Sequence, residues 1–425
     1  MSMSKAISMP RRRLSIALIS ALGTLVVVLP TFWTMGQLAR WWAVPLMSVI
    51  MAVMLGLSLP RALATVRRSC WAFAGAGLLV ATVVASVASV WVSAGGLWRI
   101  AGALVFAVLA GVTVWLRRFG TLWQSVGLVS ALPLFAVLVA PMPTALSWNL
   151  LLWVTISALA AGLWAFAAAY LSGDATSLPV AITAPSLKPR MLSGTRMAIQ
   201  LSVAIGLAFG AAQVIKLDHL VWPVLTALIV QSNNRGRGDV LWKGTQRLIG
   251  ALVGTAVATA LVGLWPAGDS RSVVAIFVLI GIAAALRPFG YVYWAACVTA
   301  GLAFLYGFLG QGGMSELGQR LIGITVGGII AIAVAWFLLP VRTIDVVNSR
   351  MKSLGATLRA IGDARDQGTV PASLVTDMTT ARSELAKLQP TLAAAKVLGI
   401  GEIRTMSDKV KELITKADAA YLSCD

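Results

Sequence analysis

The chain has 425 residues, of which 59% are apolar and only 12% are charged. Soluble domains usually carry about one quarter charged residues, so this composition excludes a soluble domain, and its apolar content excludes a disordered chain. A single His and three scattered Cys exclude a zinc cluster and a disulfide framework. We therefore predict an all-α polytopic membrane protein that lies in a lipid bilayer.

Apolar runs that are long enough to cross a bilayer as helices recur along the first 340 residues. We expect about twelve spanning helices. Two of the runs are short, and short or broken helices are where transporters often build their sites. The predicted spans are 14–32, 41–57, 71–92, 97–116, 122–141, 148–171, 195–215, 219–232, 245–265, 272–286, 290–310 and 318–340.

The distribution of Lys and Arg predicts the orientation of these spans. With the N-terminus inside, the inside loops carry 17 basic residues and the outside loops carry 5, which agrees with the positive-inside rule. Both chain ends are then expected in the cytoplasm of a bacterium, with the spans in its inner membrane. Because the net charge of +19 sits mostly in short loops, we attribute it to topology and expect no nucleic-acid partner.

A five-residue pattern indicates an internal duplication. Leu-Arg-Arg-Phe-Gly at 116–120 recurs as Leu-Arg-Pro-Phe-Gly at 286–290, at the same point of the predicted topology. Six spans per copy is an even number, so both copies enter the membrane in the same sense, as parallel repeats. The predicted regions are a first six-helix repeat at 1–172, a cytoplasmic linker at 173–193, a second six-helix repeat at 194–340 and a cytoplasmic helical tail at 341–425.

The second predicted repeat carries a family motif. His219-x-x-Trp222 is followed by a span that contains Thr226, and then by Lys-Gly-x-x-Arg-x-x-Gly at 243–250. This resembles the signature of the fusaric-acid-resistance (aromatic acid exporter) family over about 195–340, whereas the first repeat lacks the His and the Lys-Gly pair. The resemblance implies export of aromatic carboxylates, such as fusaric or hydroxybenzoic acid, with a periplasmic adaptor protein as partner. Plant aluminium-activated malate transporters, which are anion channels, share a similar motif.

Four basic residues are candidates for the path of an organic anion. Lys243 and Arg247 stand four residues apart at the start of a predicted helix, so they share a face and could gather an anion. The alternative is that they only orient the helix. Arg117 and Arg287 occupy matching places in the two copies and could hold a carboxylate at the inner mouth, or snorkel to the membrane interface. A positively lined path suits anions and repels cations.

The short span at 219–232 supplies further candidates for the path. Trp222 stands beside His219 and a proline, apart from the other span-end tryptophans, which we assign to an interfacial belt. Thr226 and Gln231 are the notable polar residues of this span. They line the path or hydrogen-bond a neighbouring helix, and both alternatives stay open.

Proton coupling has one candidate pair in the membrane part. No Asp or Glu falls in the middle of a predicted span, which weighs against a buried carboxylate relay. Asp218-His219 lies at the outer end of the short span, and His is the side chain that changes charge near neutral pH. Alternatively, Asp218 only caps the helix and His219 belongs to its first turn.

Three pairs of glycines at a spacing of four predict close helix packing. None resembles a phosphate loop, because each lies inside an apolar run without a following Gly-Lys-Ser/Thr. No nucleophile–base pair, metal cluster or cofactor motif appears, so we do not expect an enzyme. The pairs are Gly206 and Gly210, Gly250 and Gly254, and Gly323 and Gly327.

The tail at 341–425 has apolar residues at alternating spacings of three and four, typical of packed helices. We expect three helices, separated near Gly368 and Gly399, with Pro390 ending or kinking the second. These helices form an antiparallel bundle on their own, or pair with a second chain in a homo-oligomer.

Three hypotheses for the function follow. The leading one is a secondary transporter that exports small organic anions, driven by the proton gradient; aromatic carboxylic acids are the cargo that the resemblance implies. The second is a passive organic-anion channel, which needs no proton relay. The third is a non-transporting membrane scaffold whose tail recruits a partner. None of these hypotheses requires a cofactor or a metal.

Overall fold

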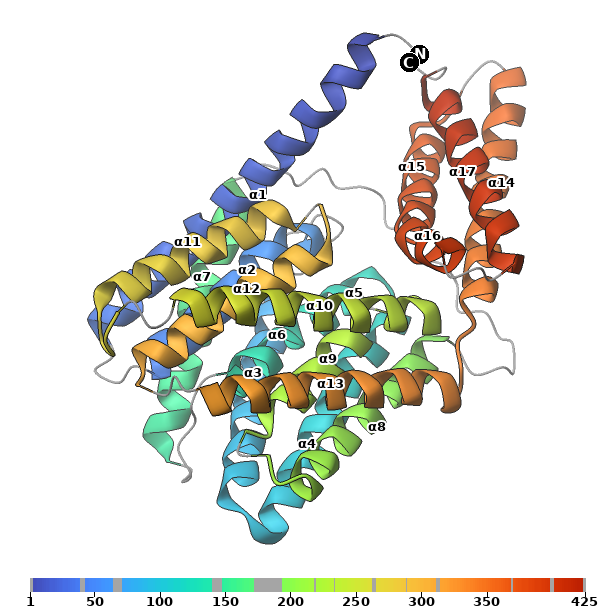
Figure 1. Ribbon diagram of the computed structural model, residues 1–425. Helices are drawn as coiled ribbons and strands as arrows, with labels where there is room; N and C mark the ends of the chain where they lie inside the picture. Colours follow the sequence, from blue (N-terminus) through green and yellow to red (C-terminus); the bar gives the residue numbers. More distant parts are fainter. Residues whose placement is uncertain are drawn as a thin grey trace. The chain divides into compact units, whose positions relative to one another are not determined.

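The computed structural model describes residues 3–38, 43–63, 71–139, 147–171, 193–217, 219–232, 234–261, 265–287, 289–310, 314–367, 370–397 and 401–422. All regular secondary structure in these ranges is helical, as predicted (Figure 1). Asp218 and nearly all of the predicted linker at 173–193 lie outside the described residues.

The helices of the membrane part follow the predicted apolar runs. Each of the twelve predicted segments coincides with helical structure. The segment 122–141 contains two helices, because Pro133 has no N–H to continue the hydrogen-bond ladder of the preceding helix. The helices are α1 (Met3–Leu38), α2 (Ala43–Leu63), α3 (Trp71–Ala94), α4 (Gly96–Trp115), the 3-10 helix η2 (Leu116–Phe119), α5 (Thr121–Ser130), α6 (Leu132–Val139), α7 (Trp148–Leu171), α8 (Ser193–Val214), α9 (Val221–Gln231), α10 (Arg237–Leu261), α11 (Ser270–Leu286), α12 (Tyr291–Phe308) and α13 (Met314–Phe337).

Eight helical stretches in the described part are long and apolar enough to cross a membrane. Three more apolar stretches are shorter: Ser48–Leu57 in α2, Val221–Gln231 in α9 and Ser270–Leu286 in α11. The first half of α10 carries several charged residues. The protein is therefore an all-α, multi-pass membrane protein, and the count of twelve spans stays a prediction.

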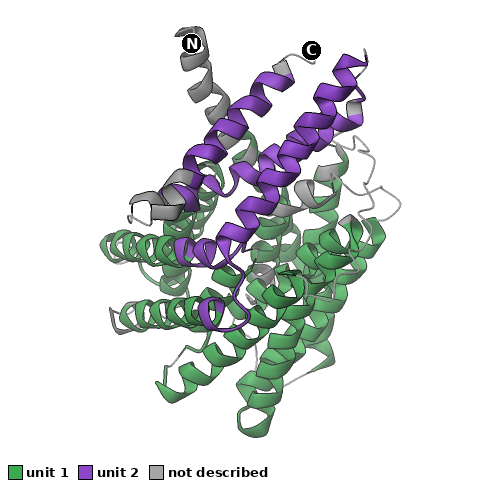
Figure 2. Cartoon of the chain, turned by 90° about the vertical axis from the view of Figure 1, so that its right-hand side faces the viewer, with its two compact units in different colours: residues 1–232, 244–334 green, residues 233–243, 335–425 purple. Residues whose placement is uncertain are grey.

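The chain divides into two compact units (Figure 2). Unit 1 comprises residues 1–232 and 244–334, and unit 2 comprises 233–243 and 335–425. The predicted tail at 341–425 lies within unit 2. The structure adds to it a segment of eleven residues from the start of α10 and the turn before it, at 233–243.

Helix pairs within unit 1 pack in a reciprocal pattern. α1 packs against α11, and α8 packs against α4, so the first helix of each predicted repeat contacts the fourth helix of the other. A T-shaped aromatic pair stands at each contact. Phe32 meets Phe277 with ring centroids 5.0 Å apart, and Phe209 meets Phe106 at 5.8 Å.

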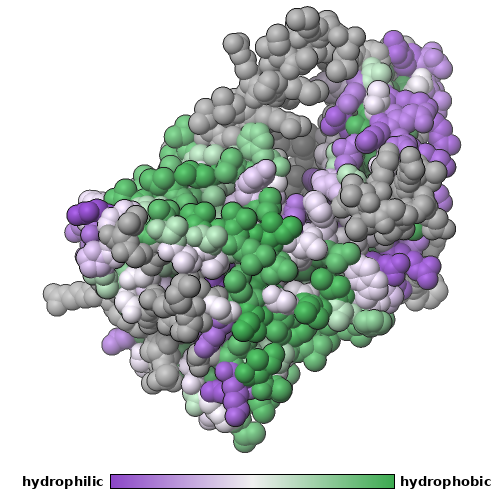
Figure 3. All heavy atoms as spheres, viewed as in Figure 1, coloured by the Kyte–Doolittle hydropathy of each residue, from purple (hydrophilic) through white to green (hydrophobic). Residues whose placement is uncertain are grey.

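The outer surface of unit 1 is apolar. Large hydrophobic side chains point outwards from several of its helices; Leu97 and Val214 are each 83% exposed, and Trp148 is 87% exposed. Figure 3 shows hydrophobic side chains gathered over the helices of unit 1 and hydrophilic ones over the tail helices. An apolar surface of this extent requires a lipid environment rather than water.

The described residues of the tail form four helices rather than the predicted three, and the additional break falls near Pro390, where the sequence predicts an end or a kink. The predicted second helix is divided into α15 and α16 at Leu388, because Pro390 cannot donate to the ladder of α15. Val347, Leu354 and Met378 are among the fully buried residues of a core that all four helices share. The tail thus packs on itself, as one of the two alternatives predicted, and pairing with a second chain stays untested. The helices are α14 (Thr343–Asp366), α15 (Ala372–Ala386), α16 (Gln389–Val397) and α17 (Gly401–Leu422).

The segment 233–243 is hydrogen-bonded to the tail within unit 2. The first N–H groups of any helix have no carbonyl partner inside that helix. At the start of α10, the N–H of Arg237 donates to the carbonyl of Val341 at 3.0 Å, and the N–H of Gly238 donates to Oγ1 of Thr343 at 3.0 Å. The tail therefore completes the start of a helix that precedes it by about 100 residues.

Candidate functional site

Helix α9 is held directly against α13 by small residues. Trp222 is 3% exposed, and Pro223 is tolerated because it lies in the first turn of α9, where its missing N–H has no carbonyl partner. A Cβ added at Gly323 would lie 2.7 Å from Cβ of Trp222, and one added at Gly327 would lie 2.2 Å from the carbonyl oxygen of Pro223. Only glycine fits there, as the predicted close packing requires.

Helix α10 packs against α12 in the same way. A Cβ added at Gly250 would lie 2.6 Å from Cβ of Ala295, and one added at Gly254 would lie 2.8 Å from Cβ of Thr299. The prediction of close packing at the third pair was wrong, because a Cβ at Gly206 or Gly210 would meet no described atom within 4 Å. Two of the three glycine pairs therefore allow close contacts, one between α10 and α12 and the other between α13 and α9.

Arg320 on α13 is buried among these helices. Its side chain is 2% exposed, its Nη2 donates to the carbonyl of Thr299 at 3.0 Å, and its guanidinium stands 4.2 Å from the centre of the Trp222 ring. Such cation–π contacts are strongest when the cation is removed from water. Arg320 lies in α13, as the predicted span 318–340 implies, but it was not among the candidates predicted for the anion path.

Arg247 on α10 is the largest fully buried side chain, at 1% exposure. It interacts electrostatically with the hydroxyl of Tyr291 and with Arg320, so two positive charges lie near each other inside unit 1. Its Nε and Nη2 and the Nε of Arg320 make no hydrogen bond with the residues described. Buried polar groups are satisfied in the great majority of cases, so these donors lack their partners.

Aromatic rings stand beside the two arginines. The ring of Tyr306 on α12 lies 6.0 Å from the Trp222 ring and 6.3 Å from the imidazole of His219. Tyr306 also interacts electrostatically with Arg320. We call the group formed by Arg247, Arg320, Trp222, Thr299 and Tyr306 the arginine cluster.

Acidic side chains of the membrane part have other partners where the structure describes them. Asp239 forms an ion pair with Lys243 at 2.9 Å, and Asp269 forms one with Arg271 at 3.7 Å. The side chains of Asp218 and Glu316 lie outside the described residues. Within the described part, therefore, the arginine cluster has an excess of positive charge.

The other predicted candidates have individual contacts. Gln231 donates from Nε2 to the carbonyl of Ala331 at 2.7 Å, so it joins α9 to α13. Thr226 is 1% exposed, and its hydroxyl makes no hydrogen bond with a described residue. Arg287 donates to the carbonyl of Leu57 on α2 at 3.3 Å.

The basic candidates outside the cluster are less buried. Lys243 is bound to Asp239 one turn earlier on α10, and Arg117 lies half-buried in η2. Their role on the path stays a prediction, as does a meeting of Arg117 and Arg287 at the inner mouth. Of the predicted candidates, Trp222 and His219 lie beside Tyr306, and Arg247 interacts with Arg320.

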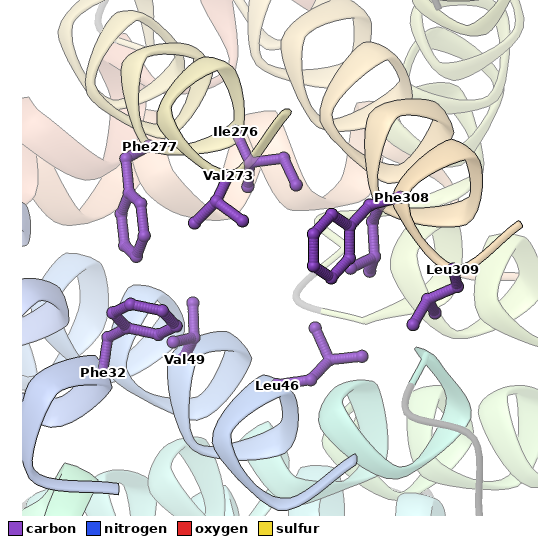
Figure 4. A pocket seen from close by; sticks show the side chains of 9 residues that line it. Phe32, Leu46, Val49, Val273, Ile276, Phe277, Phe308 and Leu309 are labelled. Atoms are coloured by element: carbon purple, nitrogen blue, oxygen red, sulfur yellow. The ribbon is translucent and has the colours of Figure 1, made fainter. Parts of the chain in front are cut away.

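An apolar pocket lies between the first and last parts of unit 1. Figure 4 shows the rings of Phe32 and Phe277 on opposite sides of it. Leu305 on α12 and Leu309 directly after it line the pocket, and Tyr306 of the arginine cluster is next to Leu305 on α12. Its lining is almost entirely apolar, and the other residues are Leu46, Val49, Val273, Ile276 and Phe308.

Comparison with known families assigns the region that holds this site. Residues 207–334 match the family described as fusaric acid resistance protein-like. The match covers the whole arginine cluster and confirms, over that segment, the resemblance predicted for about 195–340. No curated protein and no solved structure matched the chain.

The fold and the family together define a class. This is a multi-pass α-helical membrane protein in which residues 207–334 are similar to the fusaric acid resistance protein-like family. Among the residues described, no group of three His, Cys, Asp or Glu could hold a metal ion.

Proposed function

We propose that the protein is a secondary transporter that moves small organic anions across the bacterial inner membrane. One observation carries this proposal: two guanidiniums, of Arg247 and Arg320, are buried near each other with free N–H donors and no described counter-ion. A buried charge is unfavourable unless it is paired, and charged groups inside a membrane protein usually mark a substrate path.

The surroundings of the cluster favour an aromatic carboxylate. A guanidinium binds a carboxylate through two parallel hydrogen bonds, and the rings of Trp222 and Tyr306 offer apolar faces beside it. The family match points in the same direction. Export and coupling to protons belong to the proposal, with Asp218 and His219 as the candidates for proton coupling.

The proposal includes a duplicated architecture with both termini in the cytoplasm. The reciprocal contacts of α1 with α11 and of α8 with α4 support it, because a two-fold axis between parallel repeats would generate both contacts. A periplasmic adaptor and a homo-oligomer remain proposals that rest on the family resemblance and the tail helices.

The test is uptake of radiolabelled 4-hydroxybenzoate into liposomes that contain the purified protein, with and without an imposed pH gradient. Accumulation above equilibrium only with the gradient supports a coupled transporter. Flux that merely equilibrates favours the channel. Absence of flux for hydroxybenzoate and a panel of other organic anions contradicts both and favours the scaffold.

A matched pair of variants locates the site. Arg320→Gln removes a charge from the arginine cluster, whereas Arg271→Gln removes a charge from an exposed position next to Asp269. We expect flux to fall in Arg320→Gln and to persist in Arg271→Gln. Equal flux in both variants would contradict the assignment of the site.

A further inference from the structure

We propose that the arginine cluster binds two negative charges at once, so that the preferred cargo is a dianion such as an aromatic dicarboxylate. This inference rests on the proposed function and goes further, because it names the charge of the cargo. It follows from the number of buried charges, the direction of the free donors and the surroundings of the two side chains.

The number of charges is the first argument. Arg247 and Arg320 are 1% and 2% exposed, and they lie near enough to interact with each other. A bound monoanion would neutralise one of the two charges and leave the other buried without a counter-ion. An unpaired buried charge is strongly unfavourable, so a ligand with two charges is favoured over one with a single charge.

The free donors give the second argument. Arg320 already donates from Nη2 to the carbonyl of Thr299, and its Nε remains free. Nε and Nη2 of Arg247 lie on one edge of its guanidinium and make no hydrogen bond with a described residue, although the hydroxyl of Tyr291 interacts with this side chain. The two side chains stand on different helices, α13 and α10, and each can therefore bind its own carboxylate.

The aromatic surroundings of Arg320 support the same inference. Trp222 lies against Arg320, and Tyr306 lies beside Trp222, so aromatic surface borders the site. Thr226, with an unpaired hydroxyl, stands one turn after Trp222 on α9. A ligand with a ring between two carboxylates fits such a site better than a flexible polar anion.

The experiment measures direct binding to the purified full-length protein in detergent by titration calorimetry. The ligands are benzoate and the three benzenedicarboxylates, at pH 8, where every carboxylate is ionised. We expect at least one dicarboxylate to bind about tenfold or more tightly than benzoate, which corresponds to about 1.4 kcal/mol. Arg247→Gln and Arg320→Gln should each abolish this preference, because each leaves a single positive charge.

Two further variants separate charge from folding. Arg247→Lys and Arg320→Lys keep the charge and should keep a preference for dicarboxylates, with weaker binding of both ligands. Arg271→Gln, with its charge removed far along the chain from the cluster, should behave as the wild type. Gel filtration of each variant establishes that it is folded before binding is measured.

The outcomes distinguish this inference from the proposed function. If benzoate binds as tightly as all three dicarboxylates, the inferred preference for a dianion is wrong, even if benzoate is transported. A dicarboxylate preference without any flux in liposomes keeps the site and overturns the transporter. Absence of binding for all four ligands overturns both.

Discussion

The two units differ in the partners of their charged side chains. In unit 2, Arg382 forms two hydrogen bonds with Asp418, and Lys387 pairs with Glu384. In unit 1, Arg247 and Arg320 are almost fully buried and have no described carboxylate partner. Paired charges at a surface contribute little to stability, whereas unpaired buried charges are costly. The comparison supports the proposal that Arg247 and Arg320 belong to a binding site, whereas the ion pairs of unit 2 belong to its scaffold.

The largest effect should come from removing one of the buried charges. Replacing Arg320 with Met, which has a similar length, should lower anion flux by about 10- to 100-fold, as expected when a hydrogen bond to a charged group is lost. Thermal stability in detergent should stay the same or rise, because a buried charge is removed. Flux assays and melting curves check the two expectations.

One result would contradict this difference between the charges of unit 1 and those of unit 2. If Arg320→Met melts well below the wild type, the arginine supports the fold of unit 1 as Arg382 supports unit 2. Arg382→Met is the matched variant, and it should leave flux unchanged while lowering stability by up to about 1 kcal/mol.

The second prediction concerns the packing that positions the cluster. Gly327→Ala should destabilise the protein by about 1–3 kcal/mol, because its Cβ would lie 2.2 Å from the carbonyl oxygen of Pro223 and force α9 away from α13. Gly206→Ala is the control, since no described atom lies within 4 Å of the added Cβ. Melting in detergent should separate the two variants, and equal melting temperatures would contradict the close contact.

The third prediction tests whether Gln231 is structural. Gln231→Leu loses the hydrogen bond to the carbonyl of Ala331, which should lower stability by about 1 kcal/mol. The dependence of flux on anion concentration should keep the same half-saturation, because the amide is already engaged between helices. A changed half-saturation would instead place Gln231 on the path of the anion.

The smallest effect should appear in the tail. Burial raises the pKa of Glu384, but the hydrogen bond from Lys387 and the charges of Lys387, Arg350 and Arg235 outweigh it, so the pKa is lower than usual. A carboxylate with a lowered pKa adds stability above its unfolded pKa, and this stability is lost as the pH falls through the folded pKa.

Glu384→Gln should therefore reduce the acid sensitivity of the tail by a small amount. Hydrogen exchange of tail peptides in the full chain, measured at neutral pH and near pH 4, checks this. An identical loss of protection in the variant and the wild type on acidification would show that other groups control the acid response.

Most of the helices could be predicted because the bilayer permits few alternatives. Inside hydrocarbon the backbone must satisfy its own hydrogen bonds, so each apolar run becomes a helix. The helices are interrupted where proline acts locally: at Pro133 the predicted span 122–141, which remains one candidate span, contains both α5 and α6, and near Pro390 the second tail helix ends, as predicted. Both prolines are present in the sequence, but only Pro390 was used to predict the end of a helix.

The site was predictable only in part. The family motif identified His219, Trp222 and Arg247, which the structure places in or beside the cluster. Arg320 was not among the predicted candidates for the path, because an arginine near the end of a predicted span is equally compatible with an exposed position at the membrane surface. The available signal was its spacing of three and seven residues from Gly323 and Gly327, which puts it on the packed face of α13.

The hydrogen bonds between the start of α10 and the tail also set an order of events during biosynthesis. Gly238 leaves the ribosome 105 residues ahead of Thr343, its partner. At about 5–20 residues per second, its N–H waits roughly 5–20 seconds for that hydroxyl. The membrane helices thus enter the bilayer before the first turn of α10 has its hydrogen-bond partners. Those hydrogen bonds can form only after the tail has been translated.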